Sequence, residues 1–407
     1  MKKIIDYFHL DKIGGFELLF AFFPILSQYN FGKVYFAIIF LLIMDFISLA
    51  KGRKPYMFKP LLLFLVFYII HEIPILIGFG GNVFGFLQNL LTIASIFFIV
   101  PALRMEKLLG AIYLVALISM GGLIYHAALL LSGNIGELHP LTLPFLPSFD
   151  AESRAMEIIL RPTSFYWEPS SYITFMLIPM LFSLLEKKYV FTFAIVFLNL
   201  LSGSTNGIAL SFLMLAFYAL TQDVGLMSKV LVTIAGVAMG YFLMTSELFE
   251  VGVEKMNNTE IGSNQRLHNG IALIKAMPLE HIITGFPAND VTDYYYKNQN
   301  IKIADITPLD TGNVFVSDFW GVLAKYGIIG LLLYFNIYLF FFKKDRALRP
   351  YLLTLFVAMF SQCLFPGPLF AFQMMILLVY MKYGQLHEYR FLSLHNGAPN
   401  ISSPLMQ

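Results

Sequence analysis

The sequence predicts an all-α polytopic membrane protein with about twelve transmembrane helices. Hydrophobic residues make up 58% of the 407 positions and charged residues only 13%, whereas a soluble domain has about 45–50% and about 25%. So few charges cannot cover a water-exposed surface of this size. Apolar runs recur from Gly15 to Gly384, and about 17–25 apolar residues span a bilayer. We therefore expect one integral membrane domain over residues 1–407.

Hydropathy places these spans in order along the chain. No small-residue cleavage site follows the first run, so we expect a membrane helix there rather than a signal peptide. The runs in 171–221 and 350–383 are short, so a re-entrant pair or one long tilted helix would change the count by one or two. The expected spans are 15–29, 34–50, 59–79, 83–103, 108–131, 171–185, 189–202, 206–221, 226–246, 319–342, 350–365 and 367–383.

The basic residues orient the chain, because cytoplasmic loops of membrane proteins hold the excess of Lys and Arg. An even number of spans puts both termini on one side. Placing that side in the cytoplasm assigns most of the 27 basic residues to cytoplasmic segments. We expect a bacterial inner-membrane protein with cytoplasmic termini and a cytoplasmic tail at 384–407.

Two long loops then face the periplasm, 132–170 and 248–318, while every other connection is short. Long loops are uncommon unless they are functional. Within the second loop, Leu267, Ile271 and Ile274 recur at spacings of four and three. This pattern predicts a short amphipathic helix on the membrane surface.

The end of the first loop combines a cation, a carboxylate and aromatic rings. Arg161 and Glu168 flank a proline-containing segment that includes Tyr166 and Trp167. Proline restricts the backbone there, so the segment cannot simply extend the next helix. The alternative is that these residues lie at the membrane interface, with Trp167 as a belt aromatic.

The second loop carries Arg266 and His268 near its amphipathic stretch, and it closes with Asp318. Asp290 and Asp293 lie between them, in a pattern more typical of a solvated turn than of a metal site. No His pair has ligand spacing, so we expect no metal.

A small polar turn, 202–207, separates two of the expected spans on the outward side. Its Ser204 and Asn206 could supply hydrogen bonds to the same outward cavity, although alone the segment indicates only a turn. The single cysteine, Cys363, lies in an apolar run and is expected to be a buried structural thiol.

Several ionisable residues fall in or beside expected spans, where a charge normally faces a partner or a cavity. They form either a proton or substrate pathway or structural pairs between helices. His71 and Glu72 are adjacent and cannot share a helix face, so at least one needs a partner elsewhere. The residues are Asp45, His71, Glu72, His126 and Lys325.

In order and topological placement, these features resemble the Wzy-type polysaccharide polymerases and the related O-antigen ligases of the bacterial envelope. The resemblance covers nearly the whole chain in topology. Its residue signals are few: Arg161 with Phe165, Glu168 and Pro169; the 202–207 turn; Arg266 ahead of the Gly285 turn; and Ser317 with Asp318 leading into 327–330. The ligases usually carry a His before that late helix, where this chain has Val316, Ser317 and Asp318.

The resemblance implies a GT-C-like fold and a periplasmic reaction on glycans linked to undecaprenyl pyrophosphate. The growing chain moves onto a lipid-linked repeat unit with inversion, without a metal or other cofactor. Its arginine pattern transfers to Arg161 and Arg266 as pyrophosphate-binding residues, a role that guanidinium suits independently. The general base is expected to be Glu168, Asp318 or His268, in that order of preference.

Tyr166, Trp167, Ser204 and Asn206 are expected to contact the glycan, since aromatic rings can stack on sugars. Expected partners are membrane lipid and, in the same pathway, a chain-length regulator and a flippase; nucleic acid is not expected.

Two rival functions stay open. An O-antigen ligase would share the donor and transfer polymer to lipid A core instead. A lipid-linked oligosaccharide flippase would be a transporter, a class that usually shows internal repeats and polar sites at the membrane midplane. No repeat is visible here, and the polar residues gather in two outward loops, which favours an enzyme.

Overall fold

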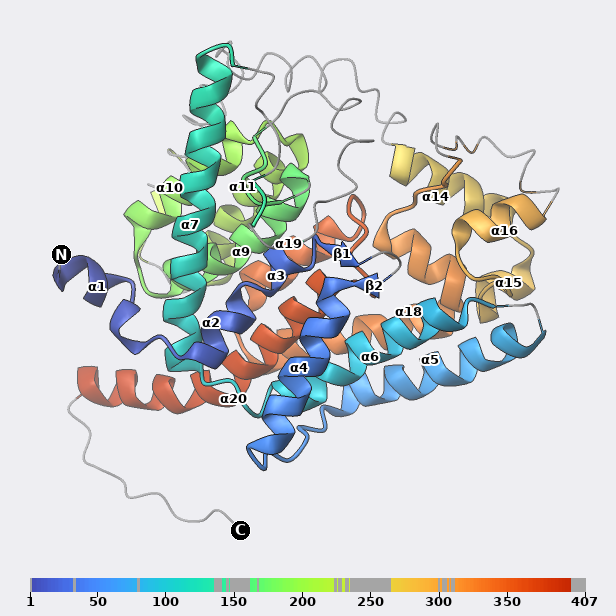
Figure 1. Cartoon of the computed structure of the whole chain (residues 1–407), viewed down its shortest axis with the longest axis horizontal. Coiled ribbons are helices and arrows are strands. Elements are labelled where there is room, and N and C mark those ends of the chain that lie inside the picture. The colour runs from blue at the N-terminus through green and yellow to red at the C-terminus, as the bar shows by residue number, and fades with distance from the viewer. Residues whose placement is uncertain are drawn as a thin grey trace.

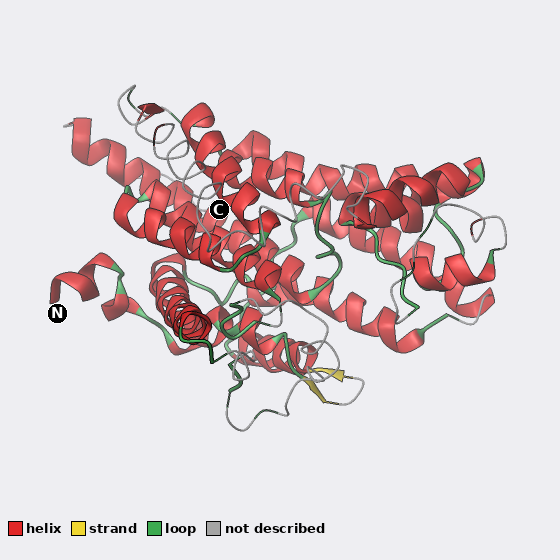
Figure 2. Cartoon of the chain, turned by 90° about the horizontal axis from the view of Figure 1, so that it is seen from above, coloured by secondary structure: helices red, strands yellow, loops and turns green. Residues whose placement is uncertain are grey.

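In the residues that it describes, the computed structural model is helical apart from one short hairpin, in which β1 (Asn30–Phe31) pairs antiparallel with β2 (Val34–Tyr35). Figure 2 shows the helices packed around one another. Figure 1 shows the loop helices α14 (Gln265–Ala276), α15 (Leu279–Thr284) and α16 (Val291–Lys297) together beside α18 (Asp318–Lys344). The structure describes residues 2–31, 34–78, 81–134, 141–143, 146, 162–166, 168–222, 225, 229–230, 234, 265–298, 301, 306, 308 and 312–396.

The described part of the chain contains three helices that are long and apolar enough to cross a membrane: α5 (Lys59–Gly78), α7 (Met105–Leu131) and α18 (Asp318–Lys344). Seven more apolar helices are α4 (Phe36–Ala50), α6 (Val83–Ile99), α9 (Pro169–Leu185), α10 (Tyr189–Leu201), α11 (Thr205–Thr221), α19 (Arg349–Ala358) and α20 (Pro368–Asn396). The short elements are α1 (Lys2–Tyr7), η1 (Leu10–Lys12), α2 (Gly15–Ala21), α3 (Phe23–Leu26), α14 (Gln265–Ala276), α15 (Leu279–Thr284) and α16 (Val291–Lys297).

The exposed face of helix α5 is apolar, as expected for a helix face in contact with lipid. Leu63, Ile70 and Ile77 recur every seven residues and are 54%, 65% and 83% exposed. The opposite face is buried and carries the carboxylate of Glu72. Water would favour the reverse arrangement, whereas a bilayer favours apolar side chains outside and ionisable ones facing a partner. The structure is therefore that of a membrane-embedded helical protein.

The ends of several predicted spans were wrong. The run 15–29 forms two short helices rather than one, because α3 begins afresh with Pro24 in its first turn, a position where proline's missing N–H costs no helical bond. The run 350–365 is helical only to Ala358, and an irregular connection follows. The last helix runs to Asn396, beyond the predicted start of the tail at 384. The predicted span 226–246 falls almost entirely outside the described residues.

The two ends of the first long loop lie within two residues of the predicted ones: α7 ends at Leu131 and α9 begins at Pro169. Most of the loop between them lies outside the described residues. The second loop contains α14, which confirms the predicted helix around Leu267, Ile271 and Ile274. Its Leu273 is fully buried and α14 packs beside α18, so this helix covers the membrane helices.

Helix α18 is broken at Gly327, whose φ of 67° and ψ of −173° are not helical. The break lets the second loop dock: Phe286 donates its N–H to the Ala324 carbonyl at 3.1 Å. Gly285, with φ of 90°, lies against the Lys325 carbonyl, where a Cβ would come within 2.1 Å. An irregular backbone at membrane depth is tolerated where protein covers it or a cavity adjoins it.

Gly327→Ala is expected to destabilise the protein, because that φ and ψ combination is nearly exclusive to glycine and a Cβ would lie 2.2 Å from the Ile283 carbonyl oxygen. Such backbone strain costs about 1–3 kcal/mol, and the clash adds to it. Thermal unfolding in detergent should show a lower midpoint than for Gly121→Ala, where a Cβ meets no atom within 4 Å. Equal midpoints for the two variants would contradict this account of the break.

The Glu186 carboxylate, between α9 and α10, connects the N-terminal segment to α7. Its carboxylate accepts hydrogen bonds from His9 Nε2 at 2.8 Å and the Tyr113 hydroxyl at 2.6 Å, and it pairs with Lys188 Nζ at 2.7 Å. Burial by itself raises the pKa of Glu186, but these bonds together outweigh burial and hold the pKa below its ordinary value of 4.5.

This cluster predicts a loss of stability in acid. A carboxyl whose pKa is lowered by folding stabilises the protein fully above its ordinary pKa, here 4.5, and the contribution disappears as the pH falls through the lowered value. Thermal midpoints of wild type should therefore drop more steeply below that pH than those of Glu186→Gln. Parallel pH profiles would contradict the assignment.

Candidate functional site

The connection between α19 and α20, residues 359–367, holds Asp318 in place at the start of α18. The Asp318 Oδ1 atom accepts hydrogen bonds from the backbone N–H groups of Leu364 at 2.7 Å and Phe365 at 3.0 Å. The Asp318 backbone N–H donates to the Gln362 carbonyl at 2.7 Å. The side chain is only 3% exposed, so a buried carboxylate is fixed here from two directions.

The same connection brings in residues from two further helices. Arg266 of α14 donates to the Ser361 carbonyl at 3.4 Å, in the same connection whose Leu364 N–H binds the Asp318 carboxylate. The Ser361 hydroxyl donates to Asn206 Oδ1 of α11 at 2.9 Å. Three residues predicted separately, Arg266, Asp318 and Asn206, thus meet around one short segment. A carboxylate beside a guanidinium provides a base next to an anion-binding group.

A cavity of about 490 Å³ opens beside Asp318, within the usual range of about 300–1,000 Å³ for ligand sites. Its wall is formed by α5, α6, α18, the second loop and the 359–367 connection. Polar side chains come from α5, α6, α18 and the second loop, and the 359–367 connection adds Cys363, Phe365 and Pro366. The polar and aromatic residues that line it include Tyr68, Glu72, Asn82, Asn89, Asn289, Asp290, Asn313, Ser317, Asp318, Lys325 and Tyr326.

A buried ion pair closes one end of this cavity. Lys325 Nζ lies 3.2 Å from the Glu72 carboxylate, and the two side chains are 12% and 7% exposed. Lys325 also donates to the Ala288 carbonyl at 3.0 Å and to the Asn289 carbonyl. The pair thereby links α5, α18 and the second loop. It confirms the expectation that one of His71 and Glu72 has a distant partner, although His71 also lies 3.5 Å from Glu72.

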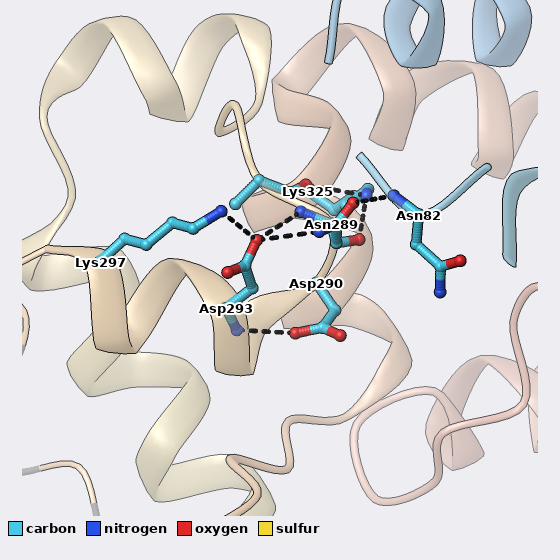
Figure 3. A network of polar contacts seen from close by, with 7 residues as sticks. Asn82, Asn289, Asp290, Asp293, Lys297 and Lys325 are labelled. Carbon is cyan, nitrogen blue, oxygen red and sulfur yellow. Dashed lines mark hydrogen bonds and ion pairs between the residues drawn. The ribbon is translucent and has the colours of Figure 1, made fainter. Parts of the chain in front are cut away.

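Figure 3 shows how the loop around Asn289 is fastened. The Asn289 side-chain oxygen accepts from the Asn82 backbone N–H at 2.6 Å. Its backbone and side-chain N–H groups donate to Asp293, which also pairs with Lys297 at 2.9 Å. The second loop is thus tied to the start of α6 as well as to Lys325, and it forms a fixed wall of the cavity.

Removing one member of the buried pair should cost far more than removing both. Lys325→Met leaves the Glu72 carboxylate buried without its cation, a change that costs about 3–5 kcal/mol. Glu72→Gln strands the ammonium in the same way. The double variant Lys325→Met/Glu72→Gln should recover much of the lost stability. Thermal unfolding of all three variants gives the coupling, and additive losses would contradict a structural pair.

The first loop is fixed onto α7 by His126, which is fully buried. Its Nδ1 atom accepts from the backbone N–H groups of Thr163 at 3.3 Å and Ser164 at 3.2 Å. The Ser164 hydroxyl donates to the Ser119 carbonyl at 2.7 Å. Since Nδ1 accepts both bonds, the ring has a structural role there, and its partners lie in the loop rather than on another helix.

The remaining predicted residues fall in different places. Arg161 and Trp167 lie outside the described residues. Tyr166 is fully buried against Tyr172 and Phe175, so its ring has no exposed face for a glycan. Glu168 is half-buried directly before α9 and accepts from the Ser170 hydroxyl at 2.9 Å.

Ser204 caps α11 by accepting from the Gly207 N–H at 3.3 Å. Asn206, two residues further along the chain, contacts the 359–367 connection. His268 is half-buried on α14, and none of the contacts that join Arg266 to Asp318 involves it. The expectation that Cys363 is buried was wrong: it is exposed and lines the cavity, because the helix that would have buried it ends at Ala358.

Sequence reasoning missed the 359–367 connection altogether, since it was assigned to a span. Polar Ser361 and Gln362 in an apolar run, followed by Pro366, Gly367 and Pro368, were the available signal for a break. Gln362 also accepts from the Thr174 hydroxyl at 3.0 Å, which connects the helix after Glu168 to the same segment.

No protein-family model and no curated protein matches this chain. Within the described residues, no group of three or more His, Cys, Asp or Glu side chains is placed to hold a metal ion.

Proposed function

We propose that this protein is a surface-polysaccharide polymerase of the O-antigen class. It transfers a growing glycan from undecaprenyl pyrophosphate onto the non-reducing end of a lipid-linked repeat unit, with inversion and without a metal. The observation that carries the proposal is the meeting of Arg266 and Asp318 at one segment, beside a cavity lined by amides and aromatic rings.

In this proposal Arg266 stabilises the negative charge of the leaving pyrophosphate. Breaking the bond between the sugar and pyrophosphate leaves an anion, and a guanidinium fixed before the reaction stabilises that developing charge. Guanidinium can also contact two phosphate oxygens at once. Arg266 is held by the Ser361 carbonyl, so it is positioned before the substrate arrives. In this proposal Arg161 serves the same pyrophosphate from the first loop.

Asp318 is the general base in this proposal. It takes the proton from the acceptor hydroxyl while that oxygen attacks the anomeric carbon, and the pyrophosphate leaves with the electron pair of the broken bond. Its backbone contacts fix the carboxylate in one orientation, which supports such a role. Of the three predicted bases, Asp318 alone is among the residues that line the cavity.

The proposal includes the arrangement in the membrane. The chain would span the bacterial inner membrane about twelve times in a GT-C-like fold, with cytoplasmic termini and the cavity open to the periplasm. Three membrane-length helices and the lipid-facing stripe of α5 support a membrane location. A chain-length regulator and a flippase would act beside it.

The test is genetic. The gene is deleted in its own strain, complemented at matched expression with wild type or variants, and the lipopolysaccharide is resolved on a silver-stained gel. A polymerase predicts that the deletion leaves core carrying a single repeat unit and that wild type restores the ladder. A ladder that survives deletion would overturn the proposal.

The same gel separates the rival functions. Bare core with polymer accumulating on undecaprenyl pyrophosphate would identify a ligase. Bare core without such polymer would indicate a flippase or another early step. A transport role for the buried charges would also make the neutral double variant Lys325→Met/Glu72→Gln inactive, whereas a polymerase predicts that it restores the ladder in proportion to its folded amount.

A further inference from the structure

Four of the polar side chains that line the cavity are carboxamides. Asn82, Asn89, Asn289 and Asn313 come from α6, the second loop and the segment before α18. A carboxamide both donates and accepts hydrogen bonds, as a sugar hydroxyl does. Among the residues that the structure describes, the buried Ser317 hydroxyl also lines the cavity and has no hydrogen-bond partner, which favours a ligand that brings a hydroxyl.

The Lys325 ammonium, the cation in the cavity wall, already has partners within the protein. An ammonium has three donors, and Lys325 directs them at the Glu72 carboxylate, the Ala288 carbonyl and the Asn289 carbonyl. Figure 3 shows its nitrogen turned toward the Asn289 backbone. Lys325 is thus neutralised within the protein, and its charge does not attract a ligand anion at this end of the cavity.

The other charged side chains on the described wall are acidic. Asp318 and Asp290 both line the cavity. Asp290 is exposed and caps α16 by accepting from the Asp293 N–H at 2.8 Å. Apart from the Lys325–Glu72 pair, the charged side chains of the described lining are therefore these two carboxylates.

We propose that this cavity is the glycan subsite of the polymerase and that it selects a neutral sugar over a carboxylated one. The inference rests on the proposed function and adds the chemical class of the sugar nearest the reacting bond. Amides and the Ser317 hydroxyl suit an uncharged, hydroxyl-rich ring. A uronic acid would place its carboxylate against Asp290 and Asp318 without a free cation on the described wall, and like charges select against a ligand.

The experiment uses the full chain in lipid nanodiscs and saturation-transfer NMR, which detects weak sugar binding. The probes are chitotriose, which is neutral, and trigalacturonate, which is acidic and of the same length. Chitotriose should bind at least about tenfold more tightly, since one unfavourable charge contact of this kind is worth about a factor of ten. Equal or tighter binding of trigalacturonate, or no binding of chitotriose, would overturn the inference.

Two variants locate the selectivity in the cavity. Asp290→Asn removes a charge while asparagine still caps α16, so it should raise trigalacturonate binding relative to chitotriose several-fold. Glu280→Gln removes one charge from the same loop at a side chain that is 77% exposed and does not line the cavity, and it should leave the ratio unchanged. Equal effects of the two variants would show that general surface charge, not the cavity, selects the sugar.

The outcomes separate this inference from the proposed function. If chitotriose binds selectively while the deletion strain keeps its ladder, the polymerase proposal fails and the sugar-selective cavity stands. If the ladder is lost on deletion while trigalacturonate binds as well as chitotriose, the polymerase stands and the selectivity is wrong.

Discussion

Arg266→Ala is expected to remove the polysaccharide ladder at unchanged protein amount. The loss should correspond to a rate reduced by roughly 100-fold or more, the usual effect of removing one fixed group that stabilises a developing anion. Arg266→Lys should restore only short chains, because lysine keeps the charge but loses the planar fork that holds two phosphate oxygens. The measurement is the gel assay with the membrane content of each variant determined in parallel.

A matched control lies on the same helix. Lys275 is exposed in the last turn of α14, so Lys275→Ala removes one cation from that helix away from the 359–367 connection. It should leave the ladder unchanged. If Arg266→Ala also gives a full ladder, or if both variants shorten it equally, Arg266 has no special part in the reaction.

Asp318→Asn should separate the chemistry of this residue from its structural role. Asparagine keeps the Oδ1 atom that accepts from Leu364 and Phe365, so the thermal midpoint should stay close to that of wild type. The negative charge and the ability to take a proton are lost, and the polymerisation rate should fall by roughly 10²–10⁴-fold.

Asp318→Ala provides the structural comparison. It leaves the two backbone N–H groups without their acceptor, and each unsatisfied buried group costs about 1–3 kcal/mol, so its midpoint should fall well below that of Asp318→Asn. Glu168→Gln tests the rival base in the same assay. A full ladder from Asp318→Asn, with loss of the ladder in Glu168→Gln, would move the base to Glu168.

The sequence predicted those features that depend on short stretches of chain. Composition and run length indicated a membrane-embedded helical protein, and the loop ends at 132–170 agree with α7 and α9. The four-three spacing of Leu267, Ile271 and Ile274 predicted α14. These features follow from local hydrophobicity and helical periodicity, which need no knowledge of distant contacts. The types of residue that suit phosphate and proton transfer were also visible, in Arg266 and Asp318.

The tertiary structure decided which of these residues come together. Asn206, Arg266 and Asp318 were expected to serve one outward site, but not to meet at the 359–367 connection. That segment was assigned to a span, and its contacts join residues far apart in the chain. Burial could not be predicted from residue type either: Tyr166 lies in the core, and Cys363 lies in the cavity wall. The partner of Glu72 and the docking of Gly285 against the break in α18 also depend on long-range packing, which residue type and periodicity alone do not encode.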